Sequence, residues 1–316
     1  MNSGLFELIQ TFVRVVETGS FTAVASEIGS TQPTVSRQIG ALEAHLNVRL
    51  FNRTTRSLTL TEEGRSYYNH ALSVQDAVEQ AEAAIRPGRE HVTGTLRIAG
   101  PLAFTRLQVI PRLKRFLERW PEVSAELVLN DRAIDLVEEG IDVGIRIGEI
   151  TDESLIARRI GETRRVTVAA PEYLHKRKRP DHPGDLVEHD CIVFSGLSTV
   201  DEWVFANAAT EGAIRVKVSG PVKVNVSEAV QEAVMHGLGI AVVPTWVFRG
   251  EVEEGSLIRI LDEFEPAPLP IHVVYPSRRM VTPRARAFID YLIEEFRNDP
   301  VMAERSVHNA RADQAG

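Results

Sequence analysis

The sequence predicts an α+β protein in three successive parts: an all-α N-terminal unit, one long linker helix, and a C-terminal α/β region of two lobes. Three observations lead to this prediction. Apolar residues recur at helical spacing up to about residue 86. Short apolar runs then alternate with helical stretches from residue 95 onward, which is typical of α/β sheets. A chain of 316 residues is also long for a single hydrophobic core.

Composition shifts along the chain predict where these parts begin and end. Pro87 and Gly88 end the helical pattern, because proline lacks the N–H that a helix needs and glycine favours helix ends. The last residues are polar and are expected to fray. The expected parts are an N-terminal unit over 1–61, a linker helix over 62–87, a hinge over 88–94, a two-lobed domain over 95–298 and a flexible tail over 299–316.

Two helices and a tight turn precede the most informative stretch. A first helix has an apolar face up to Gly19, and Ser20 can cap a second helix with its hydroxyl. The turn at Gly29 and Ser30 leads into a third helix over residues 31–46. Two short helices around a tight turn, packed on a preceding helix, are typical of a helix-turn-helix, whose second helix enters the major groove of DNA.

The third helix has one apolar and one polar face. We expect Thr31 to cap it with its hydroxyl, and Pro33 lies in the first turn, where a missing N–H costs little. Small or hydrogen-bonding residues on the polar face would allow close approach to base edges and phosphates. A short solvated helix is the alternative. The apolar stripe comprises Val35, Ile39, Leu42 and Leu46, and the polar face comprises Thr34, Ser36, Arg37 and Gly40.

A basic hairpin is expected over residues 48–60, with Arg53, Thr54 and Arg56 at its tip. Arginine at such a tip suits phosphate contact or insertion into the minor groove, and an ordinary solvated hairpin is the alternative. Between residues 31 and 60, four arginines accompany a single glutamate, although the whole chain has a net charge of −8. This distribution indicates a confined contact with nucleic acid rather than nonspecific binding of polyanions.

The linker helix has a narrow apolar seam whose members recur at alternating steps of four and three. Such spacing is typical of a helix that pairs with another helix, so we expect dimerisation here. Packing against the helix's own domain is the alternative. A dimer would present two recognition helices to a two-fold-related DNA site. The seam comprises Tyr67, Ala71, Val74, Val78, Ala81 and Ile85.

The N-terminal part resembles a known family. Its sequence looks like the winged helix-turn-helix of LysR-type transcriptional regulators, although Thr31 and Val24 stand where that family usually has Ser and Ala. The resemblance implies that Gln32, Pro33, Ser36 and Arg37 face the operator and that Arg53 and Arg56 belong to the wing. Thr31, Thr34 and Thr54 are further candidates for DNA contact, because of their place on the helix and at the hairpin tip. The matching runs are Gly19-Ser-Phe-Thr-Ala, Thr31-Gln-Pro-Thr-Val-Ser-Arg-Gln-Ile, Leu42-Glu, Leu50-Phe-Asn-Arg-Thr-Thr-Arg and Leu60-Thr-Glu-Glu-Gly.

The remaining two-thirds of the chain alternate strands with helices, which predicts mostly parallel sheets. The last helix is expected to return to the first lobe, so lobe I spans about 95–161 plus 270–298 and lobe II about 162–269. The stretches 131–149 and 191–196 resemble the effector-binding region of the same family. This implies a periplasmic-binding-protein-like fold with a ligand cleft between the lobes. Strands are expected at 95–100, 125–129, 141–147, 166–169, 191–194, 222–225, 240–243 and 270–275, and helices at 104–120, 134–139, 227–236 and 284–297.

Candidate ligand residues follow from topology, because α/β sheets bind ligands beyond the carboxyl ends of strands and near helix N-termini. Arg146 could donate two parallel hydrogen bonds to a carboxylate or phenolate, unless it pairs with Asp142 or Glu149. Many relatives have a hydroxyl where Ala103 stands, so the resemblance favours a more apolar effector, aromatic or quinone-like. The candidates are Pro101, Leu102, Ala103, Phe104, Thr105, Asn130, Asp131, Arg132, Arg146, Gly148, Ser195, Gly196, Asn225 and Ser227.

The motifs of enzymes and metal sites do not fit this sequence. The spacing of His182, His189 and Cys191 matches no zinc pattern, and the chain has no phosphate-binding loop and no nucleophile elbow. We therefore expect no catalytic residue, metal or cofactor, while a redox role of Cys191 stays open. One cysteine, no apolar run of bilayer length and no visible secretory signal agree with a cytoplasmic protein without membrane partners.

Two hypotheses result. The first is a LysR-type regulator that binds double-stranded DNA at an interrupted inverted repeat as a homodimer or homotetramer. It would respond to a small organic effector and contact RNA polymerase. The second is a two-lobed solute-binding or enzymatic protein whose N-terminal module does not read DNA. The basic recognition face and the missing signal peptide count against the second hypothesis.

Overall fold

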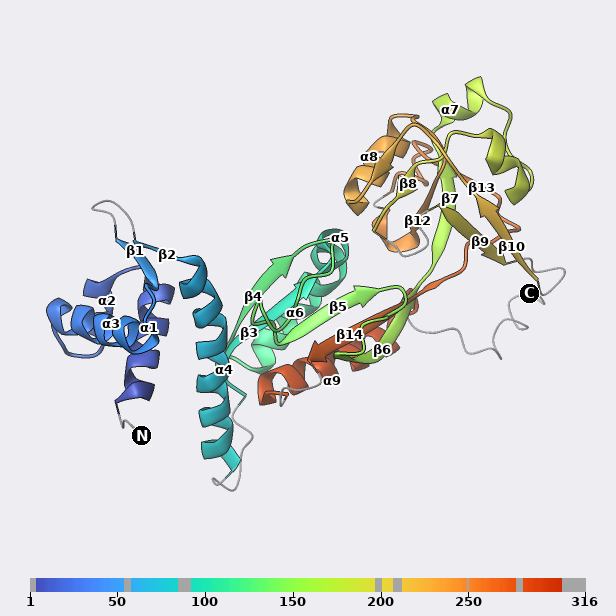
Figure 1. Ribbon diagram of the computed structural model, residues 1–316. Helices are drawn as coiled ribbons and strands as arrows, with labels where there is room; N and C mark the ends of the chain where they lie inside the picture. Colours follow the sequence, from blue (N-terminus) through green and yellow to red (C-terminus); the bar gives the residue numbers. More distant parts are fainter. Residues whose placement is uncertain are drawn as a thin grey trace. The chain divides into compact units, whose positions relative to one another are not determined.

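Figure 1 shows the computed structural model, which describes residues 4–53, 58–84, 92–196, 201–206, 212–248, 250–276 and 281–302. The chain divides into two compact units. The helical unit comprises Met1–His91 and the short segment Asp135–Ile141, and the two-lobed unit comprises Val92–Ile134 and Asp142–Gly316. Among the described residues, no helix combines the length and the apolar character that crossing a membrane requires.

The helical unit begins with helices joined by tight turns, as the sequence predicts. Gly19 ends the first helix in the left-handed region at φ 63°, and the Ser20 hydroxyl accepts a hydrogen bond from the Ala23 N–H at 3.2 Å. Phe12 and Ile39 are completely buried in its core. The elements are α1 (Leu5–Thr18), α2 (Phe21–Glu27), α3 (Gln32–Leu46), β1 (Phe51–Arg53), β2 (Leu58–Leu60) and α4 (Glu62–Ala84).

Hydrogen bonds fasten the β1–β2 hairpin to the helices on either side. The Glu43 carboxylate of α3 accepts a bond from the Leu50 N–H at 2.9 Å. The Thr61 hydroxyl donates to the Arg49 carbonyl at 2.7 Å and accepts from the Gly64 N–H at 2.8 Å. A Cβ at position 64 would lie 2.0 Å from the Leu50 carbonyl oxygen, so this approach requires glycine. Glu43, the single acidic residue between residues 31 and 60, stabilises the hairpin through its bond from the Leu50 N–H.

The segment Asp135–Ile141 forms a turn and not the helix predicted over residues 134–139. The Asp135 carboxylate accepts a hydrogen bond from the Glu138 N–H at 3.0 Å, and such local side-chain bonds compete with helix formation. Asn69 of α4, which is 5% exposed, donates to the Glu138 carbonyl at 2.6 Å. This hydrogen bond holds the segment within the helical unit.

Lobe I of the two-lobed unit is built on a five-stranded sheet in the order β4-β3-β5-β14-β6. β3 pairs in parallel with β4 and β5, whereas β14 is antiparallel to β5 and β6. Phe104, Phe116, Phe288 and Phe296 of its helices are fully buried. The elements are β3 (Gly94–Gly100), α5 (Leu102–Phe104), the π-helix η1 (Thr105–Val109), α6 (Ile110–Arg119), β4 (Val123–Leu129), β5 (Val143–Ile147), β6 (Leu155–Thr163), β14 (Leu269–Pro276) and α9 (Pro283–Arg297).

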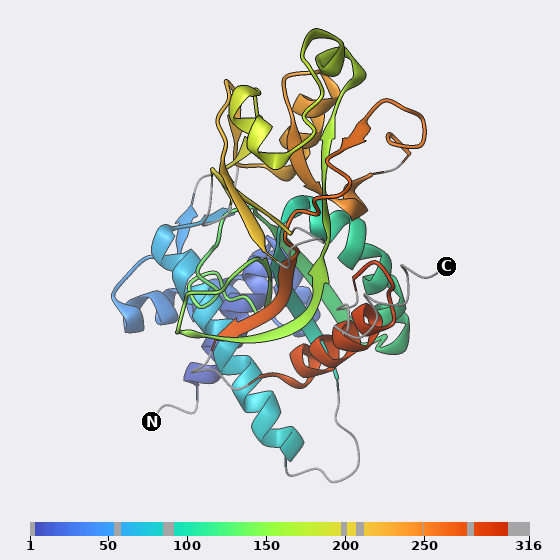
Figure 2. The same cartoon turned by 90° about the vertical axis from the view of Figure 1, so that its right-hand side faces the viewer.

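Lobe II contains the antiparallel sheet β12-β7-β13, the parallel pair β8–β11 and the antiparallel hairpin β9–β10. Two extended segments, one from β6 to β7 and one leading into β14, connect the lobes side by side (Figure 2). The elements are β7 (Arg165–Ala169), α7 (Pro171–Lys176), η2 (Pro183–Glu188), β8 (Val193–Phe194), β9 (Glu202–Ala206), β10 (Ala213–Lys217), β11 (Lys223–Val224), α8 (Ser227–Met235), β12 (Ala241–Pro244), η3 (Thr245–Val247) and β13 (Ile258–Ile260).

Two further fold predictions, beside the helix over 134–139, are wrong in detail. The sheets are mixed or antiparallel and not mostly parallel, because β14 and β13 return from distant parts of the chain and pair antiparallel with their neighbours. The helix predicted over 104–120 is interrupted by the π-helix η1. The sequence does not predict strands β6, β9, β10 and β13, because polar residues interrupt their apolar pattern and their pairing depends on partner strands elsewhere in the chain.

Candidate functional site

Helix α3 buries its apolar stripe and leaves its polar face accessible. Val35, Ile39 and Leu42 are completely buried. Thr31, Gln32, Pro33 and Arg37 are exposed, and Thr34 and Ser36 are half-buried. The predicted Thr31 cap is wrong, because its hydroxyl lies 2.9 Å from the Thr34 hydroxyl and makes no capping bond to the backbone. The Arg37 guanidinium also reaches the Thr34 hydroxyl at 3.5 Å.

The wing is described only in part. The backbone of Arg53 ends β1 and pairs with Leu58 of β2, while Thr54 and Arg56 lie outside the described residues. On the helix beside it, Gln38 donates to the Glu7 carboxylate at 3.0 Å. On the polar face of α3, the side chains of Gln32, Ser36 and Arg37 can donate hydrogen bonds to base edges or phosphates.

The seam of α4 divides into two parts. Tyr67 packs on Phe12, with 5.5 Å between the ring centroids, and Ala71 is 2% exposed in the same core. These two residues therefore pack against their own unit, which is the alternative that the sequence left open. Val74 is 43% exposed, Ala81 is exposed and Val78 is half-buried. Ile85 lies outside the described residues.

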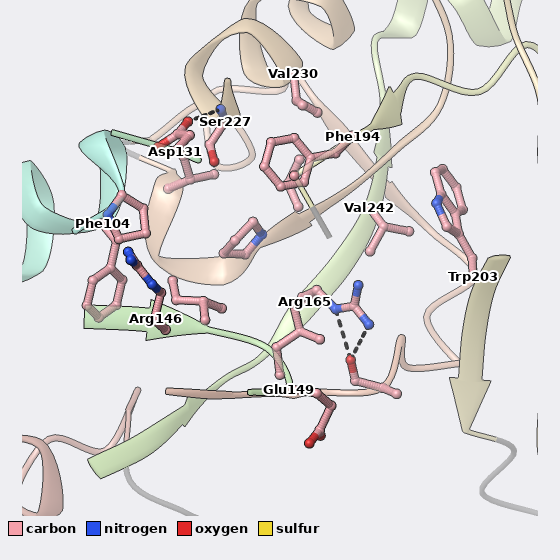
Figure 3. Close-up of a pocket in the computed structure, with 18 of the residues that line it drawn as sticks. Phe104, Asp131, Arg146, Glu149, Arg165, Phe194, Trp203, Ser227, Val230 and Val242 are labelled. Atoms are coloured by element: carbon pink, nitrogen blue, oxygen red, sulfur yellow. Dashed lines mark hydrogen bonds between the residues drawn. The ribbon is translucent and has the colours of Figure 1, made fainter. Parts of the chain in front are cut away.

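A cavity of about 540 Å³ lies between the two lobes. Phe104 and Arg146 reach it from lobe I, whereas Arg165, Phe194 and Trp203 reach it from lobe II (Figure 3). Its wall is mainly apolar and aromatic with a few charged groups, a combination typical of sites for small organic ligands.

Two arginines in this cavity have only neutral partners among the hydrogen bonds of the described residues. Arg146 donates to the Ile134 carbonyl at 3.1 Å, and burial lowers its pKa although Asp152 acts in the opposite direction. Arg165 donates through Nε to the Ala267 carbonyl at 2.9 Å and makes a second bond to the same oxygen. Burial lowers the pKa of Arg165 to about 10. An anionic group beside either guanidinium would compensate its charge.

The other charged groups of the cavity already have partners or face solvent. Arg215 forms an ion pair with Glu202 at 2.9 Å, and Glu149 is exposed. Asp142, one of the two alternatives considered for Arg146, instead lies 3.5 Å from Arg284.

The Asp131 carboxylate connects the two lobes at the cavity. Its Oδ1 accepts a hydrogen bond from the Leu102 N–H of lobe I at 2.8 Å. Its Oδ2 accepts one from the Ser227 N–H of lobe II at 3.0 Å (Figure 3). Both donors lie at the start of a helical stretch, where backbone N–H groups lack partners within the helix.

The cavity collects some of the predicted ligand residues and excludes others. Ala103 is completely buried and does not line the cavity, so the residue type at this position gives no information about the polarity of the cavity. The sequence did not predict Arg165, Trp203, Glu202, Arg215 or Trp246, because the topological rule considers only strand carboxyl ends. Pro101, Phe104, Asn130, Asp131, Arg146, Gly196 and Ser227 line the cavity, and Leu102, Ala103, Thr105, Arg132, Gly148, Ser195 and Asn225 do not.

The described residues contain no group of three or more His, Cys, Asp or Glu side chains that could hold a metal ion. His182 accepts a hydrogen bond from the Gly184 N–H at 3.0 Å as a helix cap. His189 pairs with the Tyr173 hydroxyl at 3.1 Å, and Cys191 is completely buried. These three side chains serve local structure.

Two family models match the chain and together cover most of it. Residues 6–65 match the model described as "Bacterial regulatory helix-turn-helix protein, lysR family", and residues 89–297 match "LysR substrate binding domain". The chain belongs to the LysR family of transcriptional regulators. This LysR-type regulator therefore combines a DNA-binding helix-turn-helix with an effector-binding domain, and the predicted α+β fold class is confirmed.

Relatives along the full length agree with this assignment. The transcriptional regulator CrgA of Neisseria meningitidis serogroup C (strain 8013) is 32% identical and covers 93% of this LysR-type regulator and 97% of its own length. The solved structure of Neisseria meningitidis CrgA has a TM-score of 0.56 and covers 93% of this chain and 99% of its own, at 32% identity. The Vibrio cholerae virulence activator AphB has a TM-score of 0.55 at 30% identity, covering 91% and 98%.

Proposed function

We propose that this LysR-type regulator reads an interrupted inverted repeat in double-stranded DNA through α3 and the wing. The exposed position of Arg37, opposite the completely buried Val35, Ile39 and Leu42, carries the proposal. The proposed contacts are Thr31, Gln32, Pro33, Thr34, Ser36 and Arg37, with Arg53, Thr54 and Arg56 in the wing. The regulator would act in the cytoplasm, contact RNA polymerase at the promoter and catalyse no reaction.

The exposed part of the α4 seam supports a homodimer or homotetramer. Tyr67 and Ala71 pack in the core of the helical unit. Val74, Val78 and Ala81 continue the same heptad spacing outside that core. A second copy of α4 would cover these residues. The two-fold axis of such a pair would match the symmetry of an inverted repeat.

A small organic effector is proposed to bind in the cavity and to change promoter occupancy. The aromatic walls would take an aromatic or quinone-like body, and Arg146 and Arg165 would take an anionic group such as a carboxylate or phenolate. Pro101, Phe104, Gly196 and Ser227 would complete the site. The effector would bind one arrangement of the lobes more tightly than another, and this difference in affinity would couple effector binding to DNA occupancy.

The DNA-reading part is tested with Arg37→Ala, measured by footprinting and by titration of labelled DNA from upstream of the protein's own gene. We expect the variant to lose its preference for this DNA over random DNA, since a base contact contributes about 1–3 kcal/mol of discrimination. Arg14→Ala is the matched control, because it also removes one positive charge from the helical unit but from a residue paired with Glu27 at 2.7 Å. Undiminished preference in Arg37→Ala would contradict the proposed recognition face.

A further inference from the structure

Asp131 caps two helical stretches that belong to different lobes. The residues that precede these stretches are Pro101 and Val226, and neither makes a side-chain capping bond. Asp131 supplies the missing acceptors from outside, with one carboxylate oxygen 2.8 Å from the Leu102 nitrogen and the other 3.0 Å from the Ser227 nitrogen. Acidic groups are favoured at helix N-termini because the N–H groups and the helix dipole both point at them.

This arrangement resembles a bound carboxylate ligand. The N-terminus of α8 and the Leu102 N–H together form an anion-binding position, and the side chain of Asp131 already occupies it. The Leu102 and Ser227 N–H groups belong to different lobes, so the carboxylate can accept both hydrogen bonds only when the lobes are closed around it. Figure 3 shows the hydrogen bond between Asp131 and Ser227 at the edge of the cavity.

We propose that Asp131 is an internal anion that holds the two lobes together and fills the carboxylate position between Leu102 and Ser227, and so determines which ligands the cavity accepts. The inference rests on the proposed effector cavity. A ligand carboxylate is excluded from this position by occupancy and by like charge. The anionic group of the effector is thereby directed to the arginines of the cavity.

The lobes make other contacts, which offer a matched control. Arg106 of η1 lies 3.5 Å from Glu228 of α8, so this ion pair also connects the lobes. Arg106→Gln would break that ion pair and leave both hydrogen bonds of Asp131 in place. A second control is Asp185, whose carboxylate accepts the N–H groups of Asp181 at 3.0 Å and His182 at 2.9 Å, all within one local turn.

The test is rescue of full-length Asp131→Ala by acetate, without DNA or effector. The substitution leaves two backbone donors and a space of carboxylate size, so we expect a Tm lower than wild type by roughly 5 °C, the scale of losing bonds to a charged acceptor. Sodium acetate should raise this Tm and saturate, whereas sodium chloride at equal ionic strength should not. The fluorescence of Trp203 and Trp246, which line the cavity, should follow the same titration.

Acetate also carries the carboxylate proposed for Arg146 and Arg165, so the acetate response of wild type is the baseline. Arg106→Gln and Asp185→Ala should match this baseline, and Asp131→Ala should exceed it. Equal stabilisation of all variants by acetate, or a wild-type Tm for Asp131→Ala, would overturn the proposal. If Asp131→Ala does not fold, Asp131→Asn decides: its amide fills the space, so we expect a lowered Tm that acetate does not restore, and a wild-type Tm would overturn the proposal. Since no effector is used, failure here would leave the proposed effector function standing.

Discussion

Burial decides the chemistry of Cys191. The side chain is completely buried, and its Sγ lies 3.8 Å from the Leu186 carbonyl oxygen. Burial, helped by the neighbouring Asp190, raises the pKa of the thiol to about 12. Only the thiolate is a good nucleophile, so this cysteine is expected to be inert at neutral pH. The redox role that the sequence left open has no support in this environment.

Thiol labelling in the variant Val187→Cys tests this prediction at the residue scale. Val187 is 62% exposed, so its replacement is an exposed thiol in the same molecule. At pH 8 we expect the exposed thiol to react with a disulfide reagent roughly a thousand-fold faster than Cys191, because a raised pKa lowers the thiolate fraction at any pH below it. Both thiols should react at similar rates in denaturant. Equal rates in the folded protein would contradict the assigned pKa shift.

The apolar seam of helix α4 is buried near its start and exposed further along. Near its start, Tyr67 and Ala71 belong to the core of the helical unit, and Gly64 lies against the Leu50 carbonyl. One heptad later, Val74 is 43% exposed. An exposed valine that continues an apolar seam is typical of a helix–helix interface. We therefore propose that α4 supports the hairpin at one end and pairs with a partner helix further along.

At the element scale, Val74→Asp should weaken dimerisation. A carboxylate in an apolar helix seam loses solvation without gaining a partner, so we expect the dimer dissociation constant, measured by analytical ultracentrifugation, to rise by at least about ten-fold. Affinity for an inverted-repeat DNA should fall in parallel. Val187→Asp makes the same change on lobe II at an exposed site and should leave the dimer intact. A wild-type sedimentation profile for Val74→Asp would remove α4 from the proposed interface.

At the scale of the whole molecule, the cavity joins residues that the chain keeps far apart. Arg146 comes from β5, Arg165 from β7 and Trp203 from β9, and the fold brings all three to one space. Arg165 binds a neutral carbonyl, whereas Arg215 is already paired with Glu202. A ligand anion would therefore gain more from Arg165, which has no anionic hydrogen-bond partner among the described residues, than from Arg215, which is already paired with Glu202.

This difference predicts unequal effects of the same substitution. Benzoate and its neutral analogue benzamide serve as probes, and quenching of tryptophan fluorescence reports binding. We expect Arg165→Gln to weaken benzoate binding by about 10–100-fold, the range for one hydrogen bond between charged groups, with benzamide binding unchanged. Glutamine retains a donor for the Ala267 carbonyl. Arg215→Gln should have a much smaller effect, and equal losses in both variants would argue against Arg165 as the anion site.

Local patterns predicted much of the chain. The stop at Gly19, the cap at Ser20 and the buried stripe of α3 depend on neighbours within a few residues, and the structure confirms each of them. Side-chain hydrogen bonds to near neighbours also explain two wrong predictions, the Thr31 cap and the helix over 134–139. Thr31 bonds to the Thr34 hydroxyl instead of the backbone, and Asp135 closes a turn where a helix was predicted.

The sequence by itself determined the family, the fold class and the polar face of α3, because these depend on ordered motifs and on periodicity that any reader of the chain can follow. Only the tertiary structure decided the strand directions, the membership of the cavity and the bridge at Asp131. Antiparallel pairing of β14 and the convergence of Arg146 and Arg165 depend on contacts across many tens of residues. The hydrogen bonds that the Asp131 carboxylate accepts from the Leu102 and Ser227 N–H groups depend likewise on closure of the fold, and no local pattern encodes such contacts.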